Sequence, residues 1–311
     1  MWWARLLNSI AAMFNGGAAA APLGSTYTLQ TSMPSSAAWY DAAWNGSKWV
    51  SVAQLSGGLA TNKAAYSSNG TSWTASTLPV NANWQNVIWD GTYFVATSGD
   101  SRSAYSSDGI TWSSGSGGGT GNHIDLTTNG SGISVAVAYY NGGNNLKYTT
   151  NASSWNSVTL GSSLRLLGVA YGNSIWVVTP GAASTDIYTS TNGSSWTLQS
   201  GVMPNSRSYT ITYGGTKFIA VSATYGAYST NGTSWTSMTV PSGTWQNPTY
   251  SNGVYLITSY LTTDAITSTD GISWTARTLP AAYGVINPSG GNNIFMLMPG
   301  DTVTTNYITS P

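Results

Sequence analysis

The segment YSSNGTSW at residues 66–73 decides the fold, because the chain contains six versions of it. The other five are YSSDGITW at 105–112, YTTNASSW at 148–155, TSTNGSSW at 189–196, YSTNGTSW at 228–235 and TSTDGISW at 267–274. Their closing tryptophans lie 39 to 43 residues apart. A turn-rich, β-prone repeat of about 40 residues has the length of one four-stranded propeller blade. We call the segment the box and predict that each copy marks one blade of a β-propeller.

The residues between boxes agree with this prediction. The stretch WQNVIWDGTYFVAT at 84–97 has two apolar runs around an Asp-Gly turn, which predicts a hairpin of inner strands. Equivalent stretches lie at 42–52, 126–138, 169–178, 211–221, 249–257 and 286–297. The chain therefore has seven inner hairpins but only six boxes.

The two ends of the repeat region account for the missing box. Residues 307–310, YITS, resemble the third strand of a blade, and the chain has no box after them. Near the other end, TYTLQTSMP at 26–34 matches SWTLQSGVMP at 195–204, the strand that follows a box. We predict an all-β, seven-bladed β-propeller over residues 25–311. Pairing of its N- and C-terminal strands would close the ring and leave no exposed edge strand.

The box has the chemistry of a tight turn. Asn or Asp followed by Gly permits positive backbone φ angles, and the side-chain oxygen can accept bonds from nearby backbone N–H groups. The closing Trp would begin the outermost strand and pack between the sheet and a neighbouring turn. We therefore assign structural turns to Asn69, Asp108, Asn151, Asn192, Asn231 and Asp270.

The box resembles the Asp-box, or bacterial neuraminidase repeat, whose pattern S-x-D-x-G-x-x-W occurs in sialidases and many other propellers. Here the spacing is one residue shorter, Ala152 replaces Gly once, and Asn outnumbers Asp by four to two. In propellers with Asp-boxes these turns lie on the face opposite the active site, so the resemblance implies a scaffolding role. Six calcium or sugar sites are the alternative interpretation. Calcium prefers carboxylate ligands and four boxes have none, so we expect no metal site.

Composition excludes several function classes. Only 6% of the 311 residues are charged, against about 25% in an ordinary soluble domain. All nine acids are Asp, and the net charge is zero, which argues against partners such as nucleic acid or an anionic membrane. The absence of Cys and the single histidine, His123, exclude thiolate sites and a zinc site built on several histidines. We expect no cofactor.

Catalysis is also disfavoured. The resemblance to sialidases would imply an arginine triad, a Tyr activated by a Glu, and an Asp acid, yet the chain contains no Glu. A triad built on His123 would have to use a histidine in a Gly-rich run that lacks a nucleophile elbow. A glycosidase with a pair of Asp residues remains a formal alternative. Our prediction is that the protein is not an enzyme.

A glycan could bind where the inner strands begin and where the second strand of a blade turns into the third. Aromatic rings stack on the apolar faces of sugars, and neutral polar groups complete such sites. The candidate residues at the strand starts are Trp39, Trp84, His123, Tyr209, Trp245 and Tyr283. The loops between second and third strands add Arg102, Tyr140, Tyr225 and Tyr260. The alternative for these rings is packing between blades as core.

Residues 1–24 lie before the propeller. Apolar side chains recur there at helical spacing, which predicts a short helix over residues 2–14 that stops at Asn15-Gly16-Gly17. No Lys or Arg precedes the apolar run, unlike in a signal peptide, and about 13 residues are too few to span a bilayer. We expect a retained docking helix, which would anchor through Trp2, Trp3, Leu6, Leu7, Ile10, Met13 and Phe14.

A neutral, Glu-free propeller with a docking helix resembles bacteriophage virion appendages, such as head decorations, head fibres and tail fibres. That resemblance implies a capsid or tail protein as partner, location on the virion, and contact with host-surface polysaccharide. A homotrimer held by three such helices is one arrangement, and a single helix in a capsid groove is another. The alternative function is a secreted bacterial carbohydrate-binding propeller or sialidase-like domain.

Overall fold

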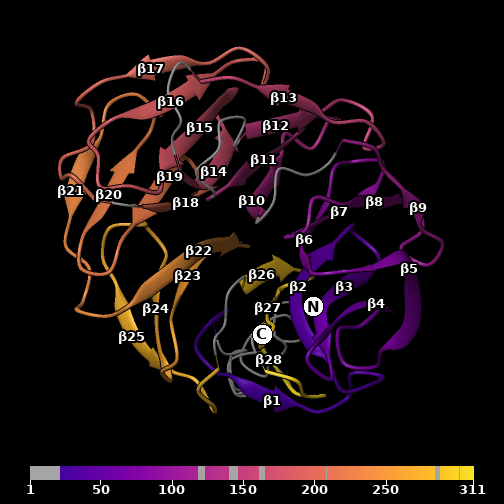
Figure 1. The fold of residues 1–311 in the computed structure, drawn as a ribbon. Coiled ribbons are helices and arrows are strands. Elements are labelled where there is room, and N and C mark those ends of the chain that lie inside the picture. The colour runs from indigo at the N-terminus through magenta and orange to yellow at the C-terminus, as the bar shows by residue number, and fades with distance from the viewer. Residues whose placement is uncertain are drawn as a thin grey trace, which may run out of the picture.

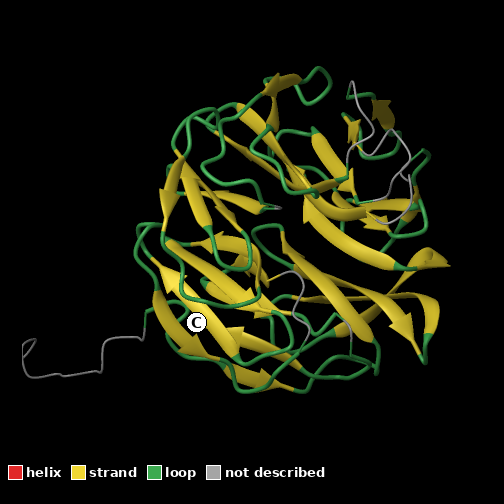
Figure 2. Ribbon diagram, turned by 60° about the vertical axis from the view of Figure 1, so that its left-hand side comes forward, coloured by secondary structure: helices red, strands yellow, loops and turns green. Residues whose placement is uncertain are grey.

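Each box lies between the third and fourth strands of a four-stranded antiparallel sheet. The computed structural model describes residues 22–117, 123–139, 146–160, 165–207, 209–283, 288–300 and 302–311. Within these ranges seven such sheets surround a central axis (Figure 1). The prediction of an all-β, seven-bladed propeller is confirmed. The described residues contain strands, turns and loops but no helix (Figure 2), and the helix predicted over residues 2–14 lies outside them.

The blades follow one another along the chain, and each runs from its inner strand outwards. Blades 1 and 2 consist of β2 (Ala38–Trp44), β3 (Trp49–Ser56), β4 (Leu59–Ser67) and β5 (Thr74–Ala82), then β6 (Trp84–Trp89), β7 (Phe94–Ser98), β8 (Ser103–Ser106) and β9 (Ser113–Ser114). Blades 3 and 4 consist of β10 (His123–Thr128), β11 (Ser134–Ala138), β12 (Leu146–Thr149) and β13 (Asn156–Val158), then β14 (Leu166–Gly172), β15 (Ile175–Pro180), β16 (Ile187–Ser190) and β17 (Thr197–Gln199). Blades 5 and 6 consist of β18 (Thr210–Gly214), β19 (Lys217–Val221), β20 (Gly226–Ser229) and β21 (Thr236–Met238), then β22 (Trp245–Ser251), β23 (Val254–Ser259), β24 (Asp264–Ser268) and β25 (Thr275–Thr278).

The seventh blade takes strands from both ends of the described chain. Its inner three strands are β26 (Pro288–Gly291), β27 (Ile294–Leu297) and β28 (Tyr307–Ser310), and its outer strand is β1 (Thr28–Gln30). Thr28 lies opposite Thr309 and Leu29 opposite Ile308 (Figure 1). The outermost position, which a box strand fills in the other six blades, is thus filled from the N-terminal side.

The six boxes form the same hydrogen-bonded turn. In blade 1, Asn69 Oδ1 accepts bonds from the N–H groups of Thr71 and Ser72, each at 2.9 Å, and Ser67 Oγ accepts one from Gly70 at 2.8 Å. The corresponding side-chain oxygens accept the same pair of bonds at Asp108, Asn151, Asn192, Asn231 and Asp270. An amide oxygen can accept these two bonds as a carboxylate oxygen does, which explains why either Asn or Asp can occupy this position.

The glycine of the box also connects neighbouring blades. Gly109 has a φ of +71°, and a Cβ at this position would lie 2.4 Å from Val50 Cγ2 of the preceding blade. Trp112, which closes the same box, is buried against that blade. The box is therefore an inter-blade contact as well as a turn.

Strand direction sorts the loops onto two faces. Because successive strands of a blade are antiparallel, the turns after the first and third strands share one face, which we call the box face. Lys48 Nζ, in such a turn of blade 1, donates to the carbonyl of Asp108 in the next box at 2.7 Å. The opposite loop face carries the connections between second and third strands and between blades. No helix in the described ranges has the length and apolar character needed to cross a membrane.

Candidate ligand site in the central channel

The seven inner strands enclose a cavity of about 480 Å³ at the centre of the ring. Every inner strand contributes lining residues, from Asp41 in β2 to Ser289 in β26. Each inner strand pairs with its own blade on one side only, so its other edge is free to face the channel. The cavity has the size of a small-molecule site.

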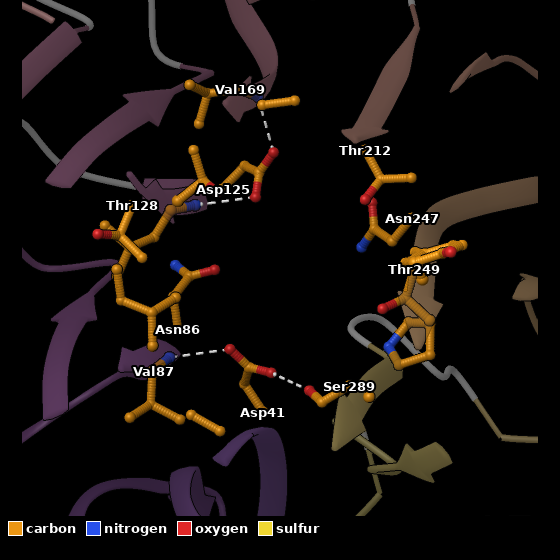
Figure 3. A pocket seen from close by; sticks show the side chains of 18 of the residues that line it. Asp41, Asn86, Val87, Asp125, Thr128, Val169, Thr212, Asn247, Thr249 and Ser289 are labelled. Atoms are coloured by element: carbon orange, nitrogen blue, oxygen red, sulfur yellow. Dashed lines mark hydrogen bonds between the residues drawn. The ribbon is translucent and has the colours of Figure 1, made fainter. Parts of the chain in front are cut away.

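Asp41 joins three blades at the channel wall. Its Oδ2 accepts a bond from the N–H of Val87 in blade 2 at 2.8 Å, and its Oδ1 accepts one from Ser289 Oγ in blade 7 at 3.1 Å (Figure 3). The N–H of Ala42 adds a third bond at 2.7 Å. Burial raises the pKa of Asp41 to about 8, although these hydrogen bonds act in the opposite direction.

Asp125 repeats the arrangement between blades 3 and 4. Its Oδ2 accepts a bond from the N–H of Val169, and its Oδ1 accepts one from Leu126, each at 2.8 Å (Figure 3). Burial raises its pKa to about 7. Both acids therefore keep a proton over part of the pH range in which an exposed Asp is ionised.

The positions of the two acids follow from the backbone donors beside them. When the inner hairpins are aligned on their turns, Val87 and Val169 are equivalent to Pro248 and Pro288. Proline has no N–H, so a carboxylate in blade 5 or 6 would have no such donor to accept from. Asn247 occupies the acid's position in blade 6. The result is a channel with acids on one side only.

The opposite side carries hydroxyl and amide groups. Figure 3 shows Thr212, Asn247 and Thr249, from β18 and β22, across the cavity from the two acids. The structure gives no hydrogen bond to the hydroxyls of Thr212 and Thr249 within its described ranges, and both side chains are partly exposed. A hydroxyl group can both donate and accept a hydrogen bond, so these two side chains can bind either an acceptor or a donor group of a ligand.

Aromatic rings surround the channel at the box face. Five residues in the last two positions of an inner strand line the cavity and are half-buried. They are Trp44, Trp89, Tyr171, Tyr213 and Tyr250. Each packs on an aromatic residue of the second strand, for example Tyr213 on Phe218 with ring centres 4.7 Å apart.

These rings also fit against glycines of the preceding blade. A Cβ on Gly214 would lie 2.1 Å from the ring of Tyr250, and one on Gly172 would lie 2.0 Å from that of Tyr213. Part of the aromatic ring system is thus structural, and only the ring surface that remains in the channel can contact a ligand.

Four of the aromatic residues predicted to bind glycan lie in the core. Trp39, Trp84, Tyr209 and Trp245 are each at most 6% exposed. The indole N–H of Trp39 donates to the carbonyl of Ser35 and that of Trp84 to Val80, in both cases four residues earlier. These rings hold the connection between blades in place, so in this structure they offer no face to a sugar. Their recurrence at strand starts comes from packing.

The other candidates on the loop face are more accessible. Arg102 forms an ion pair with Asp100 at 3.6 Å, and its side chain is 52% exposed. Tyr225 and Tyr260 are 37% and 39% exposed, and the guanidinium of Arg207 lies over the ring of Tyr225.

The remaining candidates are placed in part or lie outside the described ranges. Tyr283 is half-buried, and its hydroxyl accepts a bond from Asn306 Nδ2 at 3.2 Å. His123 begins β10, but its side chain is not among those described, and Tyr140 lies outside the described residues. Among the predicted residues whose side chains are described, none lines the central cavity.

The channel residues were missed at the sequence level, although a signal was present. Asp41, Asn86, Asp125 and Asn247 fall in one column when the inner hairpins are aligned on their turns. The strand register shifts beside this column in blades 1, 2, 3, 4 and 6, which marks a β-bulge. A column of Asx residues inside an otherwise apolar strand would have pointed to the channel wall.

The carboxylates that the structure describes all have structural partners. Beyond the channel and the boxes, Asp90 Oδ1 accepts from the N–H groups of Thr92 and Tyr93, and Asp186 Oδ1 accepts from Gly201. Asp100 pairs with Arg102, and Asp264 with Thr262. In the described ranges no group of three or more His, Cys, Asp or Glu side chains could hold a metal ion.

Comparison with known proteins supports the fold. No protein-family model matches the sequence, and no curated protein matches it. Virginiamycin B lyase from Staphylococcus aureus has a similar structure, with a TM-score of 0.75 and 12% identity over 92% of this chain and 99% of the lyase. YCF48 bound to D1 peptide gives a TM-score of 0.69 at 12% identity, over 93% and 96% of the two chains. The WD40 propeller domain of Doa1 gives 0.67 at 12% identity, over 92% and 97%.

These likenesses span nearly the whole ring but rest on few identical residues. At 12% identity they show a β-propeller and carry no function across. The three include an enzyme and a peptide complex, and none of them is named as a sialidase or a phage protein. The chemistry of this chain has to be inferred from its own residues.

Proposed function

We propose that this chain is a non-enzymatic binding propeller displayed on a bacteriophage virion, as a head decoration, a head fibre or a tail fibre. Residues 1–24 would anchor it to a capsid or tail protein, and the ring would face outwards to contact host-surface glycans. The proposal that the chain is not an enzyme rests on one observation, the interactions that the described carboxylates make. All eight accept hydrogen bonds or pair with a cation within the scaffold.

The placement of the few cations supports a role outside the cell. Four of the nine cations, Lys63, Lys147, Lys217 and Arg277, lie within strands, and the Nζ of Lys147 donates to the carbonyl of Gly117 at 2.6 Å. Lys48, Arg102 and Arg207 lie in turns or loops. A protease that cleaves after Lys or Arg needs an extended, accessible backbone, which paired strands do not provide. A small number of cleavage sites, four of them within paired strands, suits a protein that is exposed to secreted proteases.

Purified particles provide the test of the virion role. Particles from a density gradient are digested and analysed by mass spectrometry, and we expect peptides of this chain at a fixed ratio to the major capsid protein. The N-terminal peptide of the natural product should contain Trp2 and Trp3. Presence in lysate but absence from particles would overturn the proposal, and a natural N terminus after residue 21 would favour a secreted carbohydrate-binding propeller.

The absence of catalysis has its own measurement. Purified protein is incubated with host polysaccharide, and released reducing sugar is followed over time. We expect no release above a buffer control. Release that disappears in the Asp41→Asn and Asp125→Asn variants would instead indicate a glycosidase with a pair of Asp residues.

A further inference from the structure

The central cavity has two chemically different walls, whereas the scaffold around it repeats from blade to blade. Asp41 and Asp125 stand on one wall, while Thr212, Asn247 and Thr249 stand on the other (Figure 3). The outer turns are the same in six blades, whereas the channel positions differ from blade to blade. The prolines Pro248 and Pro288 account for the lack of acids on the second wall, but they do not require the hydroxyl groups that stand there.

The charge of the lining restricts what can bind. None of the described residues that line the cavity is Lys, Arg or His. A phosphate, sulfate or carboxylate ligand would be buried without a positive partner, which is unfavourable. The two acids carry raised pKa values because of burial, so the wall carries at most a partial negative charge near neutral pH. The site therefore favours an uncharged ligand.

The polar groups match a ligand rich in hydroxyls. The Thr212 and Thr249 hydroxyls have no hydrogen bond among the described residues, and the two residues stand on the neighbouring inner strands β18 and β22. The half-buried rings of Trp44, Trp89 and Tyr250 add apolar surface at the box-face mouth. Hydroxyl donors and acceptors next to aromatic faces suit the alternating O–H and C–H surfaces of a sugar.

From this geometry we infer that the central cavity binds the end of a neutral sugar chain, one or two residues long, with Thr212 and Thr249 as its hydrogen-bonding partners. The cavity of about 480 Å³ lies within the range for small-ligand sites and would admit a group of that size. The inference deepens the proposed function, on which it rests for the choice of glycan as partner. It places the site in the channel and not at the exposed residues Tyr225 and Tyr260 of the loop face.

The test uses the full chain and four probes: glucose, galactose, N-acetylglucosamine and maltose. Saturable binding is measured by titration calorimetry and by saturation-transfer NMR. The double variant Thr212→Val/Thr249→Val keeps side-chain shape and removes both hydroxyls. We expect it to bind the best probe at least about tenfold more weakly, since two hydrogen bonds to the ligand are lost.

Three further variants separate ligand contact from folding. Thr212→Ser/Thr249→Ser restores the hydroxyls and should restore binding, because a merely structural defect would not follow the hydroxyl group. Thr236→Val makes the same change at an exposed site in β21 and should bind like the wild type. Tyr225→Ala/Tyr260→Ala removes the exposed rings of the loop face and should leave binding unchanged. Thermal melts check that each variant is folded.

The outcomes distinguish this inference from the proposed function. Unchanged affinity in the valine double variant, or no saturable binding of any of the four probes, would overturn the channel site. Loss of binding in the Tyr225→Ala/Tyr260→Ala variant alone would also overturn it, while glycan binding as such would stand. Channel binding by a chain that is absent from virions would support this inference and overturn the virion role.

Discussion

Asp270 in a box turn and Asp41 in the channel both accept hydrogen bonds from backbone N–H groups, but their pKa values are shifted in opposite directions. Backbone N–H bonds from Ser273 and Ile272 lower the pKa of Asp270 to about 2. Asp41 accepts two backbone N–H bonds as well, but burial dominates and raises its pKa to about 8. The comparison shows that donors decide the charge of a carboxyl group at the rim, whereas desolvation decides it in the channel.

The box turns repeat from blade to blade, whereas the residues of the channel wall do not, and the source of their hydrogen-bond donors explains this difference. The box repeats because one short turn satisfies its own backbone in each of the six blades that contain it. The channel wall depends on which donors the next blade presents, so its residues vary around the ring.

The pH dependence of stability gives the largest predicted effect. Above about pH 4 the unfolded chain loses the protons of Asp41 and Asp125, while the folded protein holds them until about pH 8 and about pH 7. Unfolding then releases protons, so the free energy of unfolding should fall by several kcal/mol between pH 4 and 8. Chemical denaturation at a series of pH values measures this.

Variants of the channel acids and of a box carboxylate should change different parts of this pH profile of stability. Asp41→Asn/Asp125→Asn should flatten the decrease between pH 4 and 8, because it removes both carboxyl groups that line the cavity. Asp270→Asn should act only on the acid side, where the native carboxylate loses its contribution as pH falls from about 4 to about 2. A profile that is flat in the wild type would contradict the contrast between Asp41 and Asp270.

The inter-blade role of the box predicts the next largest effect. Gly109→Ala adds a methyl group 2.4 Å from Val50 Cγ2 at a φ of +71°, so left-handed strain of about 1–2 kcal/mol and overpacking of about 1–3 kcal/mol should add up. Gly201→Ala is the matched control, since its φ is +70° and nothing lies within 4 Å. It should cost only the strain. Equal midpoints in urea denaturation for the two variants would show that the box does not connect blades.

The turn chemistry of the box predicts a smaller effect. Asn231→Ala removes an oxygen that accepts bonds from the N–H groups of Thr233 and Ser234, and it should cost about 1–2 kcal/mol, as loss of a helix cap does. Asn231→Asp keeps the acceptor and should stay within about 0.5 kcal/mol of the wild type at pH 7. Thermal melts compare the two; similar losses in both would mean that the amide group has another role.

The exception among the boxes predicts the smallest effect. Ala152 has a φ of +60° where the other five boxes have Gly, and its methyl group is fully buried. Ala152→Gly relieves strain of about 1–2 kcal/mol but loses about 0.8 kcal/mol of methyl burial. The net change should lie within about 1 kcal/mol, measured by denaturation. A large loss of stability would indicate that the methyl contact with blade 2 outweighs the turn geometry.

Sequence reasoning reached the architecture because each blade is encoded locally. The spacing of Trp73, Trp112 and their equivalents predicted the length of one blade, and the seven inner hairpins predicted seven blades. The match between residues 26–34 and 195–204 assigned β1 to an outer-strand position. It did not reach the residues that line the central cavity. Trp39 and Trp84 were chosen because aromatic rings recur at strand starts, but there the recurrence reflects burial.

The sequence by itself determined the repeating unit, the turn at each box and the number of blades. Each of these depends on residues a few positions apart, whose φ angles and hydrogen bonds are local. Only the tertiary structure decided that Asp41 would meet Val87 and Ser289, which are 46 and 248 residues away. It also decided that Thr212 and Thr249 would face the acids across one cavity, because closing the ring brings all seven inner strands to a common axis.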